Sequence, residues 1–214
     1  TFIKKYISKP EDFSYQQVGR VISTDRIVDI CLKDKVFYDK SNGGVTISGG
    51  EPTYQIDFLI ELLTKLKKSG IHTAIETTAF NSMENIKKLY NLIDLFIIDI
   101  KHWNFDVHKK YTSVSNELIL NNISDIIKNA NDYLIRIPVI PDFNFSNDDT
   151  ERFISLFKDM GIEKVELLPF HQLGEGKYEN YGINYTYKDV KALNKDDLSQ
   201  MLDIFTKSGI NAFA

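Results

Sequence analysis

Strand-like and helix-like segments alternate along the 214 residues of this chain. Helical apolar spacing follows each apolar, β-branched segment, and the strands begin roughly 23–38 residues apart. This alternation predicts a parallel α/β fold with right-handed crossovers. The expected strands are 45–48, 72–77, 95–101, 133–140 and 164–169, and the expected helices are 24–38, 55–69, 83–92, 117–130, 148–160 and 195–208.

Two features favour part of a (β/α) barrel over a dinucleotide-binding sheet. Polar residues stand at the end of every expected strand, and no G-x-G-x-x-G opens a helix. We therefore expect a partial barrel of about five parallel strands with outer helices, in one domain covering residues 1–214. Residues 1–18 are of mixed composition and contain Pro10, so we expect them to be irregular.

Charge and hydropathy limit the partners. The net charge of −4 and the pI near 5.6 argue against nucleic acid. No apolar run reaches the ~18–20 residues that span a bilayer, and the first residues lack a signal-peptide pattern, so we expect no membrane partner and a cytoplasmic location.

The chain contains one cysteine, Cys31. A single thiol cannot form an internal disulfide, and it cannot supply the roughly three or four thiolates of an iron–sulfur cluster. Ile27, Ile30 and Cys31 fall on one helical face, which predicts a buried structural thiol.

The string Gly43-Gly-Val-Thr-Ile-Ser-Gly-Gly-Glu-Pro-Thr-Tyr-Gln55 reads as a short strand that runs into a glycine-rich turn. Gly49 and Gly50 permit a sharp bend and a close approach by a ligand. Backbone carbonyls and the Glu51 carboxylate make the turn rich in acceptors, which suits an ammonium group better than a phosphate.

Because ligand sites of parallel α/β folds lie at the carboxyl ends of the strands, the residues placed there are the candidates. Their chemistry suits a zwitterionic nucleoside. Lys101, Arg136 or His171 can bind its carboxylate, and Asp99 can accept hydrogen bonds from its ribose hydroxyls. Glu76 and Thr77 can hold a small cation near the carboxylate. In strand order the candidates are Ser48, Gly49, Gly50 and Glu51; Glu76, Thr77 and Thr78; Asp99, Lys101 and His102; Arg136; and Glu166 with His171.

Five blocks resemble, in order, the motifs of radical SAM enzymes that activate glycyl radical enzymes, such as pyruvate formate-lyase activating enzymes. The first is the glycine-rich string above, the S-adenosylmethionine motif of that family. The other four are Gly70-Ile-His-Thr-Ala-Ile-Glu-Thr-Thr78, Ile98-Asp-Ile-Lys-His102, Arg136-Ile-Pro-Val-Ile-Pro-Asp-Phe-Asn144 and Leu167-Leu-Pro-Phe-His-Gln-Leu-Gly-Glu-Gly-Lys-Tyr178.

The resemblance implies an oxidoreductase that uses S-adenosyl-L-methionine and a [4Fe-4S] cluster to form a 5′-deoxyadenosyl radical. That radical takes hydrogen from a glycine of the partner, a glycyl radical enzyme, and flavodoxin or ferredoxin is the implied electron donor. The implied cofactor-binding residues are Ser48, Gly49, Gly50, Glu51, Glu76, Thr77, Asp99, Ile100, Lys101, Arg136 and His171.

The chain departs from the family pattern at three places. Ala79 and Asp142 stand where the family usually has glycine, and Asp142 tolerates a left-handed backbone better than Ala79. The Cys-x-x-x-Cys-x-x-Cys loop is missing, so we expect an N-terminally truncated activating enzyme whose 214 residues lack cluster ligands, catalytic residues and radical activity.

Two other functions remain open. Lys101 at a strand end suits a Schiff-base lyase of barrel fold if it is desolvated. The chain also suits a non-catalytic module that binds S-adenosylmethionine or the glycyl radical partner without turnover.

Overall fold

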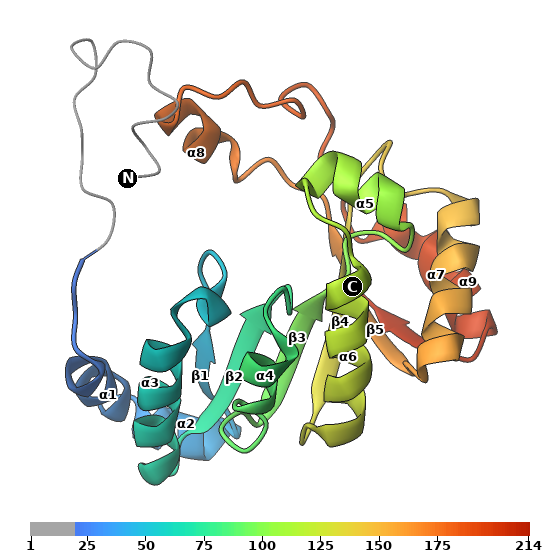
Figure 1. Cartoon of the computed structure of the whole chain (residues 1–214). Helices are drawn as coiled ribbons and strands as arrows, with labels where there is room; N and C mark the ends of the chain where they lie inside the picture. The colour runs from blue at the N-terminus through green and yellow to red at the C-terminus, as the bar shows by residue number, and fades with distance from the viewer. Residues whose placement is uncertain (1–19) are drawn as a thin grey trace.

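A computed structural model describes residues 20–214, and the predicted irregular segment 1–18 lies outside the described residues. Six parallel strands form one sheet in chain order, β1-β2-β3-β4-β5-β6 (Figure 1). The sheet is an open, curved partial barrel rather than a closed one, with β1 and β6 at its edges. The strands are β1 Gly44–Ile47, β2 His72–Thr77, β3 Leu95–Asp99, β4 Tyr133–Val139, β5 Lys164–Pro169 and β6 Asn211–Phe213.

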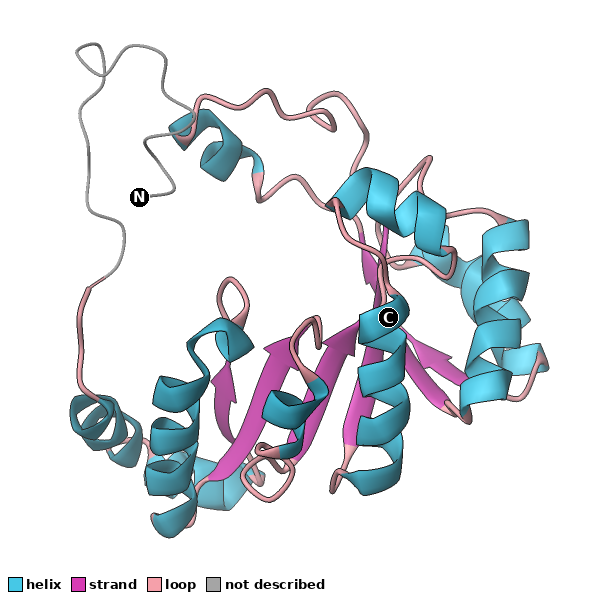
Figure 2. Ribbon diagram, viewed as in Figure 1, coloured by secondary structure: helices cyan, strands magenta, loops and turns pink. Residues whose placement is uncertain are grey.

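Helices cover the outer, convex face of this sheet (Figure 2). Among them α3 carries four buried leucines on one side, as its apolar spacing predicts. The α-helices are α1 Thr24–Leu32, α2 Lys35–Ser41, α3 Ile56–Lys68, α4 Met83–Lys87, α5 Phe105–Thr112, α6 Glu117–Asn129, α7 Asn147–Met160, α8 Glu175–Asn180 and α9 Ser199–Lys207, and the 3-10 helices are η3 Pro52–Gln55 and η4 Asp196–Leu198.

The strand register separates an apolar face from a polar one. Ile75 pairs with Phe96, and both are fully buried in the main core beneath the helices. On the concave face, Ala74, Ile97 and Leu134 form a small apolar cluster, with Leu95 partly buried against it. Charged residues lie above this cluster, toward the carboxyl ends of the strands, so the register presents the polar candidates on the inner face.

The structure differs from the expected elements in five places. The helix expected at 24–38 is split because the amides of Lys33 and Asp34 bond three residues back and close α1 with a turn. The helix expected at 83–92 ends early, at Lys87. Two helices, α5 and α8, were not expected; α5 buries only His108 and α8 buries nothing, so neither shows an apolar stripe. The three-residue strand β6 is too short for a period-two pattern.

Cys31 is half-buried rather than buried, and it packs beside the small core between α1 and α3. Partial burial raises the pKa of its thiol. Ile30, expected on the same buried face, is 38% exposed. Among residues 20–214, no helix has both the length and the apolar character needed to cross a bilayer.

Candidate functional site

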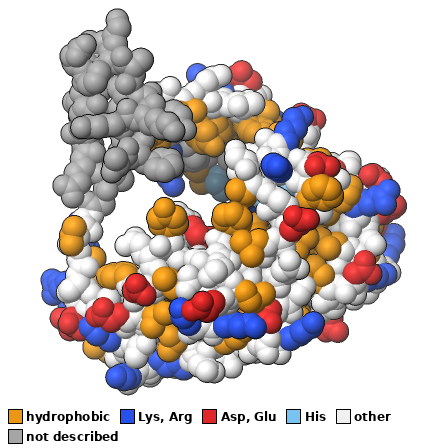
Figure 3. Space-filling view, viewed as in Figure 1, with side chains coloured by type: hydrophobic (Ala, Val, Ile, Leu, Met, Phe, Trp, Pro, Cys, Tyr) orange, Lys and Arg blue, Asp and Glu red, His pale blue; other side chains and the backbone are white. Residues whose placement is uncertain are grey.

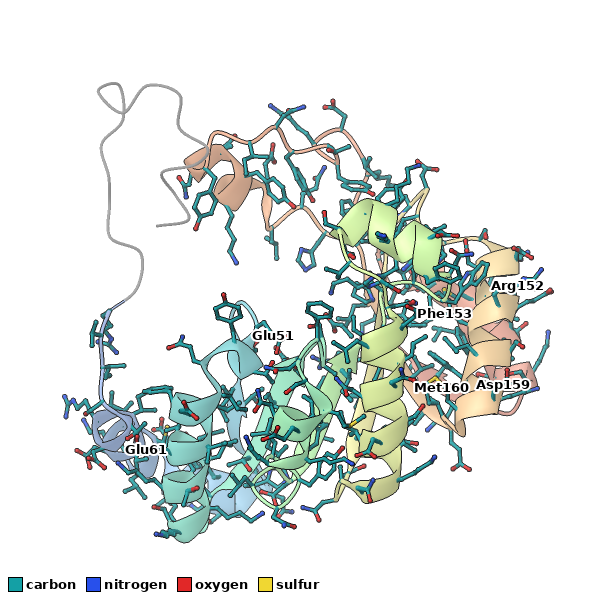
Figure 4. All side chains as sticks on the ribbon, viewed as in Figure 1. Glu51, Glu61, Arg152, Phe153, Asp159 and Met160 are labelled. Atoms are coloured by element: carbon teal, nitrogen blue, oxygen red, sulfur yellow. The ribbon has the colours of Figure 1, made fainter. Side chains whose placement is uncertain are left out.

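The parallel order of β1 to β5 places the candidate residues along one edge of the sheet. Ser48 to Glu51 follow β1, and Glu76 and Thr77 end β2. Asp99 ends β3 with Lys101 two residues beyond it, and His171 follows β5. Figure 4 shows Glu51 at this carboxyl edge, on the side that faces the segment containing α8.

Glu51 holds the glycine-rich turn against the end of β2. Its Oε1 accepts hydrogen bonds from Thr53 N at 3.2 Å, Thr53 Oγ1 at 2.7 Å and Thr77 Oγ1 at 2.6 Å. Its Oε2 accepts from Thr78 N at 2.9 Å and Thr78 Oγ1 at 2.6 Å. These five bonds occupy the lone pairs of both oxygens, so the carboxylate is committed to the turn.

The hydrogen bonds also keep Glu51 charged. Burial raises the pKa of this carboxyl, but donation from Thr77, Thr78 and Thr53 outweighs it, and the net shift is downward. None of the ion pairs within the described part of the chain includes Glu51. The turn therefore carries a negative charge held by neutral donors, which favours a cationic ligand nearby.

Gly49 supplies the bend that the turn requires. Its φ is 130°, in the region that side chains rarely adopt. A Cβ placed on Gly49 or Gly50 would meet no heavy atom within 4 Å, and both residues are exposed. The turn is thus open to a ligand at these two glycines.

A hydrogen-bonded chain of charges crosses the concave face. Ser48 Oγ donates to Glu76 Oε2 at 2.6 Å, and Arg136 Nη1 donates to Glu76 Oε1 at 2.7 Å. Arg136 also donates through Nε to Glu166. The Ser48 hydrogen bond, followed by Arg136, lowers the pKa of Glu76. Two carboxylates compensate Arg136, so it acts mainly as a bridge between β2 and β5.

Asp99 and Lys101 form the second charged group of the edge. Their Oδ2 and Nζ atoms are 3.1 Å apart, and both side chains are about one-third exposed, at 33% and 34%. Ile100, between them, turns its side chain into the core at 1% exposure, so only its backbone faces the edge. His171 is exposed, and its Nδ1 accepts from Leu173 N.

These groups fit a zwitterionic nucleoside in kind. Open carbonyls at Gly49 and Gly50, beside the ionised Glu51, suit an ammonium group, and Lys101 is the available cation for a carboxylate. Asp99 remains the acceptor for ribose hydroxyls. They do not fit an iron–sulfur cluster, because Cys31 is the only thiol in the sequence and lies on α1, which packs against α3.

Sequence reasoning missed two buried amides that shape this edge. Asn122 donates to the carbonyls of Ala79 and Asn81, both at 2.8 Å. Asn144 donates to the carbonyls of Lys101 and Pro138 at 2.8 and 2.9 Å. The sequence signal for Asn144 was its place at the end of the family-like block Arg136-Ile-Pro-Val-Ile-Pro-Asp-Phe-Asn144, whereas no motif marked Asn122.

The two residues that stand where the family usually has glycine both adopt a left-handed backbone conformation. Ala79 has φ 56° and Asp142 has φ 60°. Neither substitution removes the loop that it sits in.

Comparisons with known proteins identify the family and the fold. The family model described as Radical SAM superfamily matches residues 8–165. The 4-hydroxyphenylacetate decarboxylase activating enzyme of Clostridioides difficile strain 630 is 39% identical over 202 residues, which cover 94% of this chain and 64% of that enzyme. The pyruvate formate-lyase-activating enzyme of Staphylococcus aureus strain USA300 is 33% identical, covering 87% of this chain and 77% of that enzyme.

Solved structures show the same fold. A crystal structure of a domain of pyruvate-formate lyase-activating enzyme from Bacteroides vulgatus superposes with a TM-score of 0.66 at 29% identity, covering 80% of this chain and 98% of that domain. Streptococcus suis SuiB bound to S-adenosylmethionine gives 0.66 at 15% identity over 92% of this chain and 44% of SuiB, a likeness of fold alone. The chain belongs to the radical SAM superfamily.

Proposed function

We propose that this chain is the S-adenosylmethionine-binding part of an activating enzyme for a glycyl radical enzyme. The observation that carries the proposal is the carboxyl edge, where an open Gly49-Gly50 turn braced by ionised Glu51 shares one rim with the Asp99–Lys101 pair. Relatives named as activating enzymes support the class of reaction. The chain spans 64% of the length of the Clostridioides difficile relative, so the activity of the whole enzyme is part of the proposal.

The residues divide the binding task. Carbonyls of the Gly49-Gly50 turn accept from the ligand ammonium, Lys101 Nζ binds its carboxylate, and Asp99 accepts from ribose. Ser48, Glu76, Thr77 and Arg136 hold the glycine-rich turn against the neighbouring strands through the bonds described above. Direct contacts from Glu51, Ile100 and His171 stay predictions from the family resemblance.

In radical SAM enzymes a reduced [4Fe-4S] cluster supplies the electron that cleaves S-adenosylmethionine. The single Cys31 does not provide a cluster site within these 214 residues. The contribution of this chain is therefore to bind and orient the nucleoside, with a glycine of the partner enzyme as the hydrogen donor and flavodoxin or ferredoxin as the electron donor. We propose a cytoplasmic location.

Calorimetric titration with S-adenosylmethionine tests the binding role. We expect Asp99→Ala and Lys101→Ala each to raise the dissociation constant by roughly 10- to 150-fold, since each removes a charged hydrogen-bonding partner worth ~1.5–3 kcal/mol. Lys207→Ala is the control, because Lys207 pairs with Asp203 on the exposed surface of α9. Equal affinities in all four proteins would contradict the proposal.

A non-catalytic binding module is the second candidate, favoured by the single cysteine. Anaerobic reconstitution with iron and sulfide, followed by iron analysis and EPR, separates the two. A stoichiometric [4Fe-4S] signal that survives Cys31→Ala would show a cluster site that the sequence does not reveal. The Schiff-base alternative gains no support, because Lys101 is 34% exposed and paired with Asp99 rather than desolvated.

A further inference from the structure

Asn144 joins the loops that follow β3 and β4. Its side chain is fully buried, at 0% exposure. Nδ2 donates to Lys101 O at 2.8 Å and to Pro138 O at 2.9 Å, and Oδ1 accepts from Ile140 N at 2.8 Å. Both amide hydrogens and one oxygen lone pair are used, so the carboxamide has one orientation only.

This link stands where the sheet itself can no longer connect the two strands. The final backbone bond from β3 to β4 runs from Ile100 N to Arg136 O at 2.9 Å. In a parallel ladder the next donor would be the amide of residue 138, and proline has none. Asn144 therefore replaces the missing ladder bond with one from a side chain, one residue further along.

Two other buried side chains, Asn116 and His102, hold the same segment. Asn116 Nδ2 donates to His102 O at 2.8 Å. His102 Nδ1 accepts from Asn104 N at 2.9 Å, so its Nε2 carries the hydrogen that faces Phe143 O at 3.1 Å. The segment after β3 is thus fixed to the loop after β4 at two points, one of them Asn144.

We propose that Asn144 is a positioning residue of the nucleoside site, acting through Lys101. By fixing the carbonyl of Lys101, it sets the direction in which the Lys101 side chain leaves the backbone and the geometry of its 3.1 Å pair with Asp99. The inference rests on the proposed function, because it assigns Lys101 to the bound S-adenosylmethionine. Asn144 itself touches backbone only.

Hydrogen exchange on the ligand-free chain tests the link without reference to function. In Asn144→Ala we expect amides of the peptide covering residues 100–104 to exchange at least about tenfold faster, since the segment loses its bond to β4. Thr73→Val is the control: it removes a buried hydroxyl bond to Leu92 O at the opposite end of the sheet. Unchanged exchange at 100–104 in Asn144→Ala would overturn the proposal.

A double-mutant cycle on S-adenosylmethionine affinity tests the route through Lys101. We expect Asn144→Ala alone to raise the dissociation constant roughly tenfold, and to add less than about twofold in a Lys101→Ala background. Thr73→Val should change affinity less than twofold in either background. Full additivity of Asn144→Ala and Lys101→Ala would show a general structural effect and would refute the positioning role.

The two measurements also separate this proposal from the proposed function. If the unaltered chain shows no affinity for S-adenosylmethionine, the binding proposal fails, and with it the role of Asn144 in binding. Faster exchange at 100–104 would then show that the link is structural only. If the chain binds and Asn144→Ala binds equally well, the proposed function stands and the positioning role is refuted.

Discussion

At each end of β2 a carboxylate accepts hydrogen bonds from a threonine, but the two carboxylates differ in their surroundings. At the amino end Asp94 Oδ2 accepts from Thr73 N at 2.9 Å and from Thr73 Oγ1 at 3.2 Å. At the carboxyl end Glu51 accepts from the backbone amide and hydroxyl of Thr78. In both cases a carboxylate from a neighbouring loop accepts two hydrogen bonds from one threonine, Thr73 within β2 and Thr78 just beyond it.

The difference between the two ends is the counter-ion. Asp94 also pairs with Lys67 Nζ at 3.0 Å, so its charge is compensated. Glu51 is bonded to threonines and has no cation partner among the described ion pairs. A compensated carboxylate closes a strand, whereas an uncompensated one at an open turn leaves a negative field for a ligand.

Hydrophobic side chains border the same open turn. Tyr54 follows the glycine-rich turn at 88% exposure, and Phe80 follows β2 at 42%. Figure 3 shows hydrophobic side chains on the surface that faces the α8 segment. The carboxyl end of β2 therefore combines an uncompensated carboxylate with exposed aromatic side chains, whereas the carboxylate at the amino end is paired with Lys67.

The largest expected effect comes from Glu51→Gln. An amide nitrogen would face the donors of Thr53 or Thr78, leaving a half-buried donor unpaired, and we expect the free energy of unfolding to fall by ~2 kcal/mol. Asp94→Asn is the matched control: its amide keeps an oxygen toward Thr73 and places its nitrogen where Oδ1 meets Lys67 Nζ, so only a partly exposed ion pair is lost and we expect a loss under ~1 kcal/mol. Urea unfolding of both variants measures this, and equal losses would contradict the comparison.

Acid titration sharpens the same test. The pKa of Glu51 is lowered on folding, so its contribution is present above the unfolded value near ~4.3 and is lost as pH falls through the folded pKa. We expect the unfolding free energy of Glu51→Gln to decline less below about pH 4.3 than that of the unaltered chain. Parallel declines would show that Glu51 is not held ionised by the turn.

The sequence alone predicted the elements that show a regular hydrophobic spacing or end at a glycine. The strand spacing predicted the parallel partial barrel, and Gly70 and Gly161, with φ of 65° and 73°, predicted where α3 and α7 end. The sheet with its helices and the position of the candidate residues at one edge are confirmed.

The bonding of the site could not be read from sequence. Glu51 follows two glycines and looked like a ligand group, but whether its oxygens are free depends on Thr77 and Thr78, which lie 26 and 27 residues further along the chain. Asn144 lies 43 residues from Lys101, and no periodicity links the two. Contacts between loops of neighbouring strands depend on tertiary packing, which local patterns do not encode.

Substitutions at the two left-handed residues that flank β2 should change the free energy of unfolding less than Glu51→Gln does. Gly70, with φ 65°, precedes the strand and Ala79, with φ 56°, follows it. Gly70→Ala should cost about 1 kcal/mol in unfolding free energy, because a Cβ is strained there. Ala79→Gly should change stability by less than ~0.5 kcal/mol, since relief of strain offsets the lost buried methyl and the added chain entropy. A large loss in Ala79→Gly would mean that the packing of its methyl, not the backbone, holds the loop.

The smallest expected effect is the salt dependence of stability, which should differ between Asp94 and Glu51. Lys67 and Asp94 have side chains 39% and 28% exposed, so their pair is screened by solvent and salt. Lys67→Met should lower the unfolding free energy by ~0.2–1 kcal/mol at low salt, and this loss should shrink toward zero in about 1 M sodium chloride, where the Debye length is near ~3 Å. The loss caused by Glu51→Gln should persist at high salt, because it arises from hydrogen bonds in a half-buried turn rather than from an exposed ion pair. If salt erased both losses equally, the carboxylate at the site would be held by long-range charge, and the contrast between the ends of β2 would disappear.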